Sequence, residues 1–203
     1  MEKIISITEN CLLDLLRSES VPVEKYGKGA SNSVKRMSEC INKGEFFLGF
    51  KNGVLTRFVN VVCLAVYTCC GQFILREKYQ IKHGNNDTKS IRFLYFSLGE
   101  TVPTYETIPL AACRAMLEEL PQNIWTGAPL FPIQEESWER EGESKNYPGI
   151  NNVYSFHKFT TSLTQGISLV ETSIYEEECN ITTGFDWVWV SKMKQFFKPV
   201  PKN

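Results

Sequence analysis

The segment from Gly99 to Pro121 constrains the fold of this chain more than any other stretch of its sequence. Thr107 is a residue type that caps helix N-termini, and Pro109 suits a first helical turn, where its missing N–H leaves no hydrogen bond unmade. Pro121 ends the helix, because proline cannot continue one. The sequence therefore predicts a helix that includes Arg114–Leu120.

Two adjacent carboxylates near the end of this helix are candidate metal ligands. Arg114 and Glu118 lie one turn apart on the same face, and Glu119 lies about 100° further round. Mg²⁺ prefers hard oxygen ligands and usually shares them with a substrate phosphate. The pair is therefore suited to bridging a metal ion and a pyrophosphate group. The alternative is an ordinary surface Arg–Glu pair, which stabilises a helix by about 0.2–0.5 kcal/mol.

The residues before this helix are predicted to form strands. Asn52-Gly53 lies between two apolar runs and is a strong hairpin signal. The run that follows the hairpin is apolar and β-branched, which is typical of a central strand. The predicted strands are 45–50, 55–58, 59–67, 72–80 and 90–98.

The remaining chain is divided into an extension and a main domain. Residues 1–44 are predicted to be a helical extension with a short amphipathic helix within residues 1–20 and a second helix at 33–42, and residues 45–203 are predicted to be the main domain. Residues 135–145 are strongly charged and fit either a solvated strand or a loop. The later predicted elements are strands at 152–160 and 185–190 and a short helix at 191–197.

The charged residues around the helix resemble the Nudix box, a Glu followed after seven residues by Arg-Glu-apolar-any-Glu-Glu-any-Gly-apolar. The matching positions are Glu106, Arg114, Met116, Glu118 and Glu119. Nudix domains also approach their Glu-bearing helix through a strand, a hairpin, a further strand and a loop. The resemblance implies an α+β fold, an α/β/α sandwich in which a Nudix-like mixed β-sheet presents the helix.

Three positions depart from the box. Ala115 stands where the family has a Glu, and Pro121 stands where it has a Gly. Gly99 lies one residue too far from Glu106. Because a missing carboxylate weakens metal binding, Ala115 bears directly on whether the helix supports turnover.

The resemblance also implies roles for the matching residues. Glu118 and Glu119 would hold Mg²⁺ or Mn²⁺ against a diphosphate, and the metal would orient or ionise the attacking water. Arg114 would orient the carboxylates, and Glu106 would hold the loop before the helix in place. A base that replaces the missing Glu could come from an acidic segment, in which the candidates are Glu135, Glu136, Glu176, Glu177 and Glu178.

Other residues are candidates that also have simpler structural explanations. His157 can act as an acid or base, although a lone strand histidine is more often structural. Trp187 and Trp189 can stack on a purine base, although their spacing favours packing on a sheet face. The cations that could meet phosphates from the strands before the box are Arg76, Lys78 and Arg92.

Short segments elsewhere are similar to a further Nudix-like branch. They are Gly29 with its following helix, the Arg-Phe-Val-Asn-Val-Val run that begins at Arg57, and the Ser-Lys-Asn-Tyr-Pro-Gly run from Ser144 to Gly149. These segments do not identify a substrate.

Composition excludes several classes of function. The net charge of −1 gives no basic field for non-specific nucleic-acid binding, and no apolar run approaches the roughly 20 residues that span a bilayer. The charged amino terminus is unlike a secretory signal, so we expect a cytoplasmic location. Two histidines are too few for a three-His metal site. Seven cysteines without a Cys-x-x-Cys pair are expected to be reduced, and vicinal Cys69-Cys70 cannot form a tetrahedral zinc site unaided.

Two functional hypotheses follow. The first is a metal-dependent hydrolase that cleaves the pyrophosphate linkage of a nucleotide-type or other organic diphosphate. The second is a catalytically degenerate Nudix-fold module that binds a ligand or a protein partner. Single-stranded RNA binding through exposed aromatic residues has no dedicated motif here, and we expect neither nucleic acid nor a membrane as a partner. A homodimer remains open.

Overall fold

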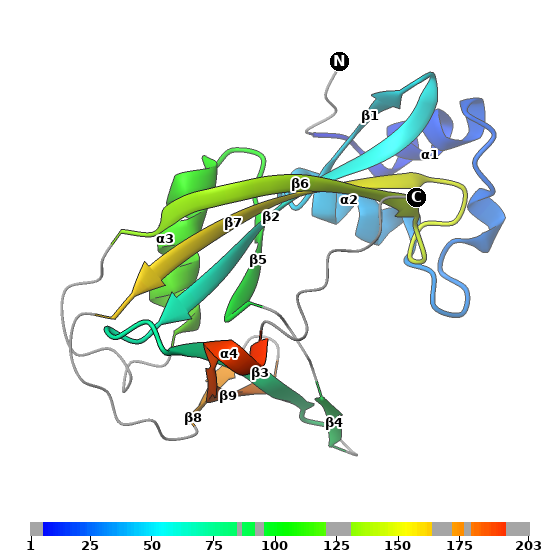
Figure 1. The fold of residues 1–203 in the computed structure, drawn as a ribbon. Coiled ribbons are helices and arrows are strands. Elements are labelled where there is room, and N and C mark those ends of the chain that lie inside the picture. Colours follow the sequence, from blue (N-terminus) through cyan, green and yellow to red (C-terminus); the bar gives the residue numbers. More distant parts are fainter. Residues whose placement is uncertain are drawn as a thin grey trace. The chain divides into compact units, whose positions relative to one another are not determined.

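The structure, a computed structural model, describes residues 6–84, 87–91, 96–120, 131–163, 172–176 and 180–193. The described residues combine helices with a nine-stranded sheet, which confirms the α+β class (Figure 1). The helices are α1 (Glu9–Ser18), the 3₁₀ turn η1 (Val23–Lys25), α2 (Val34–Asn42), α3 (Ile108–Glu119) and α4 (Val190–Met193). The strands are β1 (Phe47–Lys51), β2 (Val54–Tyr67), β3 (Phe73–Lys82), β4 (Thr88–Ile91), β5 (Leu98–Val102), β6 (Ile133–Glu143), β7 (Asn151–Ser162), β8 (Thr172–Glu176) and β9 (Ile181–Trp189).

The sheet has the strand order β6-β7-β2-β3-β9-β8, with β1 and β5 paired to β2 and β4 paired to β3. Among the described residues, no helix is both long enough and apolar enough to span a lipid bilayer.

Both predicted amino-terminal helices form, and side-chain caps fix where they begin. Thr8 accepts a hydrogen bond from the backbone N–H of Cys11 at the start of α1. Ser33 accepts one from the N–H of Arg36 at the start of α2. Each cap satisfies a backbone donor that has no partner within its helix. The predicted helix at 33–42 is confirmed, and the short helix predicted within residues 1–20 is confirmed as α1, which begins after Thr8.

The predicted hairpin at Asn52-Gly53 is confirmed. Asn52 has φ of 53° and Gly53 has φ of 77°, the two positive values that a type I′ turn requires. Lys51 pairs with Val54 across the turn. The strands predicted at 55–58 and 59–67 are instead one continuous strand, because no turn residue interrupts the β-branched run.

The strands after the hairpin agree with the predicted ranges to different degrees. Of the strand predicted over 90–98, residues 90–91 belong to β4 and Leu98 belongs to β5, whereas residues 96–97 form a bend, and residues 92–95 lie outside the described part of the chain. Residues 135–145 form most of the exposed strand β6, as the solvated-strand alternative predicted. The strands predicted at 72–80, 152–160 and 185–190 correspond to β3, β7 and β9. The helix predicted at 191–197 is described only as α4 up to Met193, and its remaining residues lie outside the described part of the chain.

The chain divides into two compact units. Unit 1 comprises residues 1–62, 101–111 and 137–157, and unit 2 comprises residues 63–100, 112–136 and 158–203. The division passes through β2, β5, α3, β6 and β7, each of which contributes residues to both units. The boundary predicted between residues 44 and 45 lies inside unit 1 and stays a prediction.

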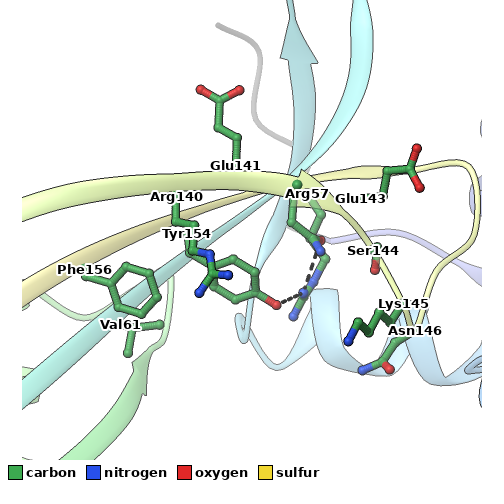
Figure 2. A pocket seen from close by; sticks show the side chains of 12 residues that line it. Arg57, Val61, Arg140, Glu141, Glu143, Ser144, Lys145, Asn146, Tyr154 and Phe156 are labelled. Atoms are coloured by element: carbon green, nitrogen blue, oxygen red, sulfur yellow. Dashed lines mark hydrogen bonds between the residues drawn. The ribbon is translucent and has the colours of Figure 1, made fainter. Parts of the chain in front are cut away.

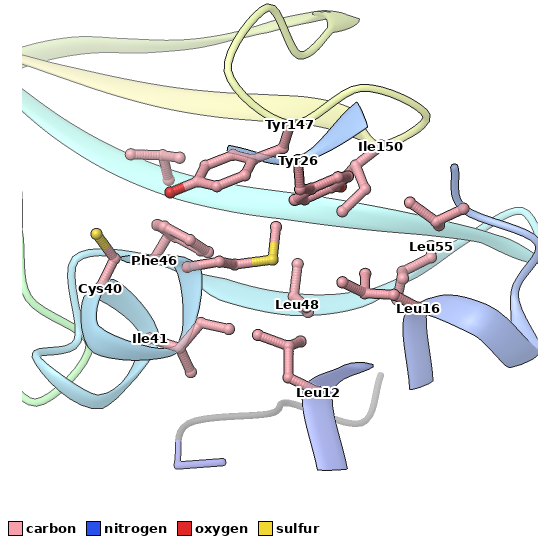
Figure 3. Close-up of a cluster of buried hydrophobic side chains, with 13 residues drawn as sticks. Leu12, Leu16, Tyr26, Cys40, Ile41, Phe46, Leu48, Leu55, Tyr147 and Ile150 are labelled. Atoms are coloured by element: carbon pink, nitrogen blue, oxygen red, sulfur yellow. The ribbon is translucent and has the colours of Figure 1, made fainter. Parts of the chain in front are cut away.

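The core of unit 1 joins its helices to its strands. Leu12 and Leu16 from α1 and Ile41 from α2 are fully buried together with Leu48 from β1 and the Tyr147 ring (Figure 3). Burial of each such side chain contributes about 1.5–3 kcal/mol relative to exposure. The amino-terminal helices are therefore part of the packing that positions the strands of this unit.

The core of unit 2 is built on β3 and β9. These strands pair in antiparallel register, with Ile74 opposite Val188. Ala65 and Ile74 are buried together. The Ser97 hydroxyl links β2 to β3, because it accepts a hydrogen bond from Val66 N–H and donates one to Leu75 O. This hydroxyl satisfies buried backbone groups that would otherwise lack a partner.

Candidate functional site

The predicted carboxylate-bearing helix forms as α3, and Arg114 and Glu118 share a face as predicted. Arg114 Nη1 donates a hydrogen bond to Glu118 Oε2 over 3.1 Å and lies 3.7 Å from Glu100 Oε1. The Glu118 side chain is 57% exposed. One of the two predicted metal ligands is therefore already held by a guanidinium, in a pair that contributes about 0.3–0.5 kcal/mol to the helix.

Ala115, where the Nudix box has a Glu, is fully buried. It shares the buried side of α3 with Ala111, Ala112 and Met116. A carboxylate at this position would lose its hydration and would need a cation or metal beside it to remain charged. The alanine thus suits the packing of the helix.

The other box residues are divided between the units. Glu106 is half-buried in the loop before α3 and belongs to unit 1, whereas Arg114, Glu118 and Glu119 belong to unit 2. Within the described ranges, no three His, Cys, Asp or Glu side chains are grouped so that they could hold a metal ion. Proteins often hold Mg²⁺ with only one or two carboxylates, and substrate phosphates supply further ligands. Glu118 and Glu119 would provide two such carboxylates without a third protein ligand.

Several other predicted site residues have structural partners. Arg76 makes a two-pronged ion pair with Asp186, with N–O distances of 2.9 and 2.6 Å, which leaves it less available to a phosphate. Glu135 and Glu136 bind Lys158 Nζ at 2.8 and 3.4 Å. The residues Arg92, Glu177 and Glu178 and the side chain of Glu176 lie outside the described part of the chain.

The two tryptophans on β9 lie in packed surroundings. The Trp189 ring packs against Phe73 with 4.3 Å between centroids, although it remains 47% exposed. Trp187 is half-buried, and its Nε1 atom is buried without a hydrogen-bond partner in the described residues. This arrangement is what packing on a sheet face predicts.

A cleft of about 500 Å³ lies in unit 1 over β2 and β7 and beside the end of β6 (Figure 2). Its volume is within the roughly 300–1,000 Å³ typical of small-molecule sites. Figure 2 places Arg57 and Tyr154 in its middle, Phe156 at one end and Lys145 and Asn146 at the other. The lining residues are Arg57, Val61, Arg140, Glu141, Gly142, Glu143, Ser144, Lys145, Asn146, Asn152, Tyr154 and Phe156.

Arg57 is fixed by aromatic rings and by two hydrogen bonds. Its guanidinium carbon lies 4.3 Å from the Phe46 ring centroid and 5.6 Å from that of Tyr147. Arg57 Nη1 donates to the Tyr154 hydroxyl at 3.0 Å and to Asn152 Oδ1 at 3.4 Å. Arg57 Nε is buried and has no hydrogen-bond partner among the described residues. The guanidinium is thus held in place, with donors left for a ligand or water.

Strand β6 separates its charges between two faces. Arg140, Glu141 and Glu143 all border the cleft, and Glu141 forms an ion pair with Lys51 together with Glu139. Figure 2 shows Glu141 and Glu143 pointing away from the side of the strand that carries Arg140. Alternate residues of a strand point to opposite faces, so Arg140 extends from the other face of β6 than the carboxylates of Glu141 and Glu143.

The loop at one end of the cleft is held by its own hydrogen bonds. Tyr147 N–H donates to Ser144 Oγ at 3.1 Å, and Ser144 N–H donates to Ile150 O at 3.0 Å. Asn32 N–H donates to Asn146 O at 2.9 Å. Tyr147 is 2% exposed, and burial raises the pKa of its phenol to about 12, so the ring stays neutral. Hydrogen bonds within the chain therefore hold this wall of the cleft in place.

Sequence reasoning did not predict this cleft. Two of the short segments similar to a further Nudix-like branch, the run that begins at Arg57 and the run from Ser144 to Gly149, both contribute to its lining. Their similarity was a signal that pointed to these residues, but nothing in the sequence indicated that they meet.

His157 gives a prediction about pH. Its Nδ1 atom is buried without a hydrogen-bond partner in the described residues, and burial lowers the pKa of the imidazole from its ordinary value of 6.5. As the pH falls below 6.5, His157 takes up a proton more readily in the unfolded chain than in the folded one. The free energy of unfolding should therefore decrease as the pH falls from 6.5. Urea unfolding at about pH 7 and about pH 5.5 should show a smaller loss for His157→Leu than for wild type. Equal losses would contradict this account.

The described geometry offers two distinct candidate sites, the carboxylates of α3 in unit 2 and the cationic cleft of unit 1. Comparison of the chain with protein-family models, with curated proteins and with solved structures gives no match in any of the three.

Proposed function

We propose that this chain is a ligand-binding module of Nudix-like organisation whose cleft in unit 1 takes a small organic anion of the nucleotide diphosphate class. Arg57 carries the proposal, because it is a fixed, partly buried guanidinium that no described carboxylate neutralises. Planar guanidinium groups recognise phosphate oxygens through paired hydrogen bonds, and these are stronger than neutral ones.

The charge of the cleft supports an anionic ligand. Arg57, Arg140 and Lys145 line it, and none of the three forms an ion pair with a carboxylate of the described residues. Two acids of β6 also belong to the lining: Glu141 is paired with Lys51, and Glu143 points away from the side of the strand that carries Arg140 (Figure 2). The lining thus carries more cationic than anionic side chains, and a bound anion would be attracted to that excess.

The aromatic residues support a ligand with a planar group. The Phe156 ring stacks on Trp138 with 5.3 Å between centroids and on Tyr154 with 5.9 Å. Aromatic side chains stack on nucleic-acid bases with about 1–3 kcal/mol per base. The lining also includes Val61 at the Phe156 end, whereas the opposite end carries Lys145. A nucleotide has the same polarity, with an aromatic base at one end and phosphates at the other.

The module should bind its ligand without a metal ion. We expect ADP-ribose, titrated calorimetrically into the protein, to bind equally well with and without EDTA and to be recovered intact. Adenosine, which has no phosphate to meet the cations, should bind at least about 10-fold more weakly. Binding that disappears in EDTA, with accumulation of a monophosphate, would exclude a metal-independent module.

A metal-dependent pyrophosphohydrolase is the second candidate. The shared face of Arg114 and Glu118 favours it, because that face is what the Nudix box requires. In that case Mg²⁺ or Mn²⁺ should support release of a monophosphate, and the double variant Glu118→Gln with Glu119→Gln should abolish it. The same variant should leave cleft binding unchanged if the module proposal holds. Absence of turnover across a panel of diphosphates with metal present would eliminate the enzyme.

A further inference from the structure

Two exposed thiols, Cys69 and Cys70, lie side by side in the loop between β2 and β3 of unit 2. Gly71 N–H donates to Thr68 O at 2.8 Å, and Thr68 N–H donates to Phe73 O at 3.0 Å. Gly71 has φ of 67°, a conformation that glycine adopts without strain. These bonds close a tight loop that leaves both thiols open to solvent.

The sulfur of Cys70 lies beside a hydroxyl group. The Thr68 hydroxyl oxygen lies 3.3 Å from Cys70 Sγ. This hydroxyl, followed by the backbone N–H of Gln72, lowers the pKa of the Cys70 thiol below its ordinary value. The thiolate is the nucleophilic form, and the Thr68 hydroxyl lies within hydrogen-bonding distance of Cys70 Sγ, so Cys70 is the position at which oxidation is expected to begin.

Cys63, which lies in β2 shortly before this loop, is a buried thiol and contrasts with the two exposed ones. It is 4% exposed, and burial raises the pKa of its thiol to about 12. Cys63 therefore remains protonated and shielded while the loop thiols meet solvent. Reactivity towards oxidants follows thiolate character and exposure, so the loop pair should react first.

We propose that Cys69 and Cys70 form a hydroperoxide-sensing thiol pair, in which Cys70 is oxidised and Cys69 resolves the product. The Cys70 thiolate attacks a peroxide oxygen, an S–O bond forms, the O–O bond breaks, and hydroxide leaves when the oxidant is hydrogen peroxide. The thiolate of Cys69 then attacks the sulfenic sulfur, an S–S bond forms, and the departing hydroxide becomes water. Each disulfide consumes one hydroperoxide, which is reduced as the two thiols are oxidised.

The disulfide would be readily reversible. Adjacent Cα atoms lie about 3.8 Å apart across a trans peptide, whereas disulfides usually join Cα atoms roughly 4.4–6.8 Å apart. The ring closed by neighbouring cysteines is therefore strained, and strained disulfides have the more oxidising potentials of labile, regulatory bonds. This property suits a sensor and not a structural crosslink.

The test is mass spectrometry of the full-length reduced protein after a short exposure to hydrogen peroxide and alkylation of the remaining thiols. The tryptic peptide that follows Arg57 and ends at Arg76 carries the pair together with Cys63. We expect this peptide to escape alkylation at Cys69 and Cys70, with a mass two hydrogen atoms below that of the same peptide with these two thiols free, and to take up two alkyl groups when dithiothreitol is added before alkylation. Cys69→Ser should stop at a sulfenic acid that dimedone traps, and Cys70→Ser should form neither product.

Cys11 is the internal control, because it is an exposed thiol in the same molecule. We expect Cys70 to react several-fold faster than Cys11, and Thr68→Val to reduce that advantage. Circular dichroism of each variant checks that the fold is retained. Equal rates at Cys11 and Cys70, or no disulfide in wild type together with no sulfenic acid in Cys69→Ser, would overturn the proposal.

Discussion

Arg57→Met is expected to weaken binding of ADP-ribose to the cleft by about 10- to 100-fold. Hydrogen bonds to charged groups contribute about 1.5–3 kcal/mol, and each 1.4 kcal/mol is tenfold in affinity. Methionine retains an apolar stem that fills the space beside Phe46 but presents no donor. Isothermal titration calorimetry in EDTA measures the effect directly.

Two further variants separate charge from geometry at this position. Arg57→Lys keeps the positive charge but loses the planar fork that donates to Tyr154 and Asn152, so its affinity should fall between wild type and Arg57→Met. Arg36→Met removes an arginine of unit 1 that pairs with Glu39 and Glu45 outside the cleft lining, and it should bind like wild type. Unaltered binding by Arg57→Met, in a variant that unfolds like wild type, would rule out the assigned role.

Gly149→Ala is expected to destabilise the protein by about 3 kcal/mol, through an unfavourable backbone conformation and a steric clash. Gly149 has φ of 82°, which residues with a Cβ adopt only at a cost. A Cβ built there would lie 2.4 Å from Cδ of Pro22, a ring atom that cannot rotate away. Urea denaturation should show the loss, and ADP-ribose affinity should fall as well, since this loop also positions Lys145.

Gly29→Ala is the matched control for this prediction. Gly29 has φ of 60°, but a Cβ there would meet no atom within 4 Å. The variant should therefore cost only the conformational term of about 1 kcal/mol. Similar losses for the two variants would show that the contact with Pro22 does not restrain the loop.

Local features were predictable from sequence where a few adjacent residues decide the structure. Asn52-Gly53 gave the hairpin correctly because both residues tolerate positive φ. The spacing of Arg114 and Glu118 placed them on one face because the helical period is fixed. Turn chemistry and periodicity need no knowledge of distant residues.

The cleft was not predictable because it depends on distant parts of the chain. Arg57 donates to Asn152 and Tyr154, which lie 95 and 97 residues further along. The acidic composition around Arg140 also concealed that alternate residues of β6 face opposite ways. For α3, sequence reasoning identified the carboxylates, but only the packing of the helix showed that Ala115 is buried. The Nudix resemblance itself stays a prediction.

A ¹H–¹⁵N correlation spectrum of the labelled protein, titrated with ADP-ribose in EDTA, tests the central claim most directly. The account predicts saturable shifts of the amides around Arg57, Lys145 and Tyr154, with those of α3 unchanged. Shifts confined to α3, or no shifts at any ligand concentration, would contradict a nucleotide-binding cleft in unit 1.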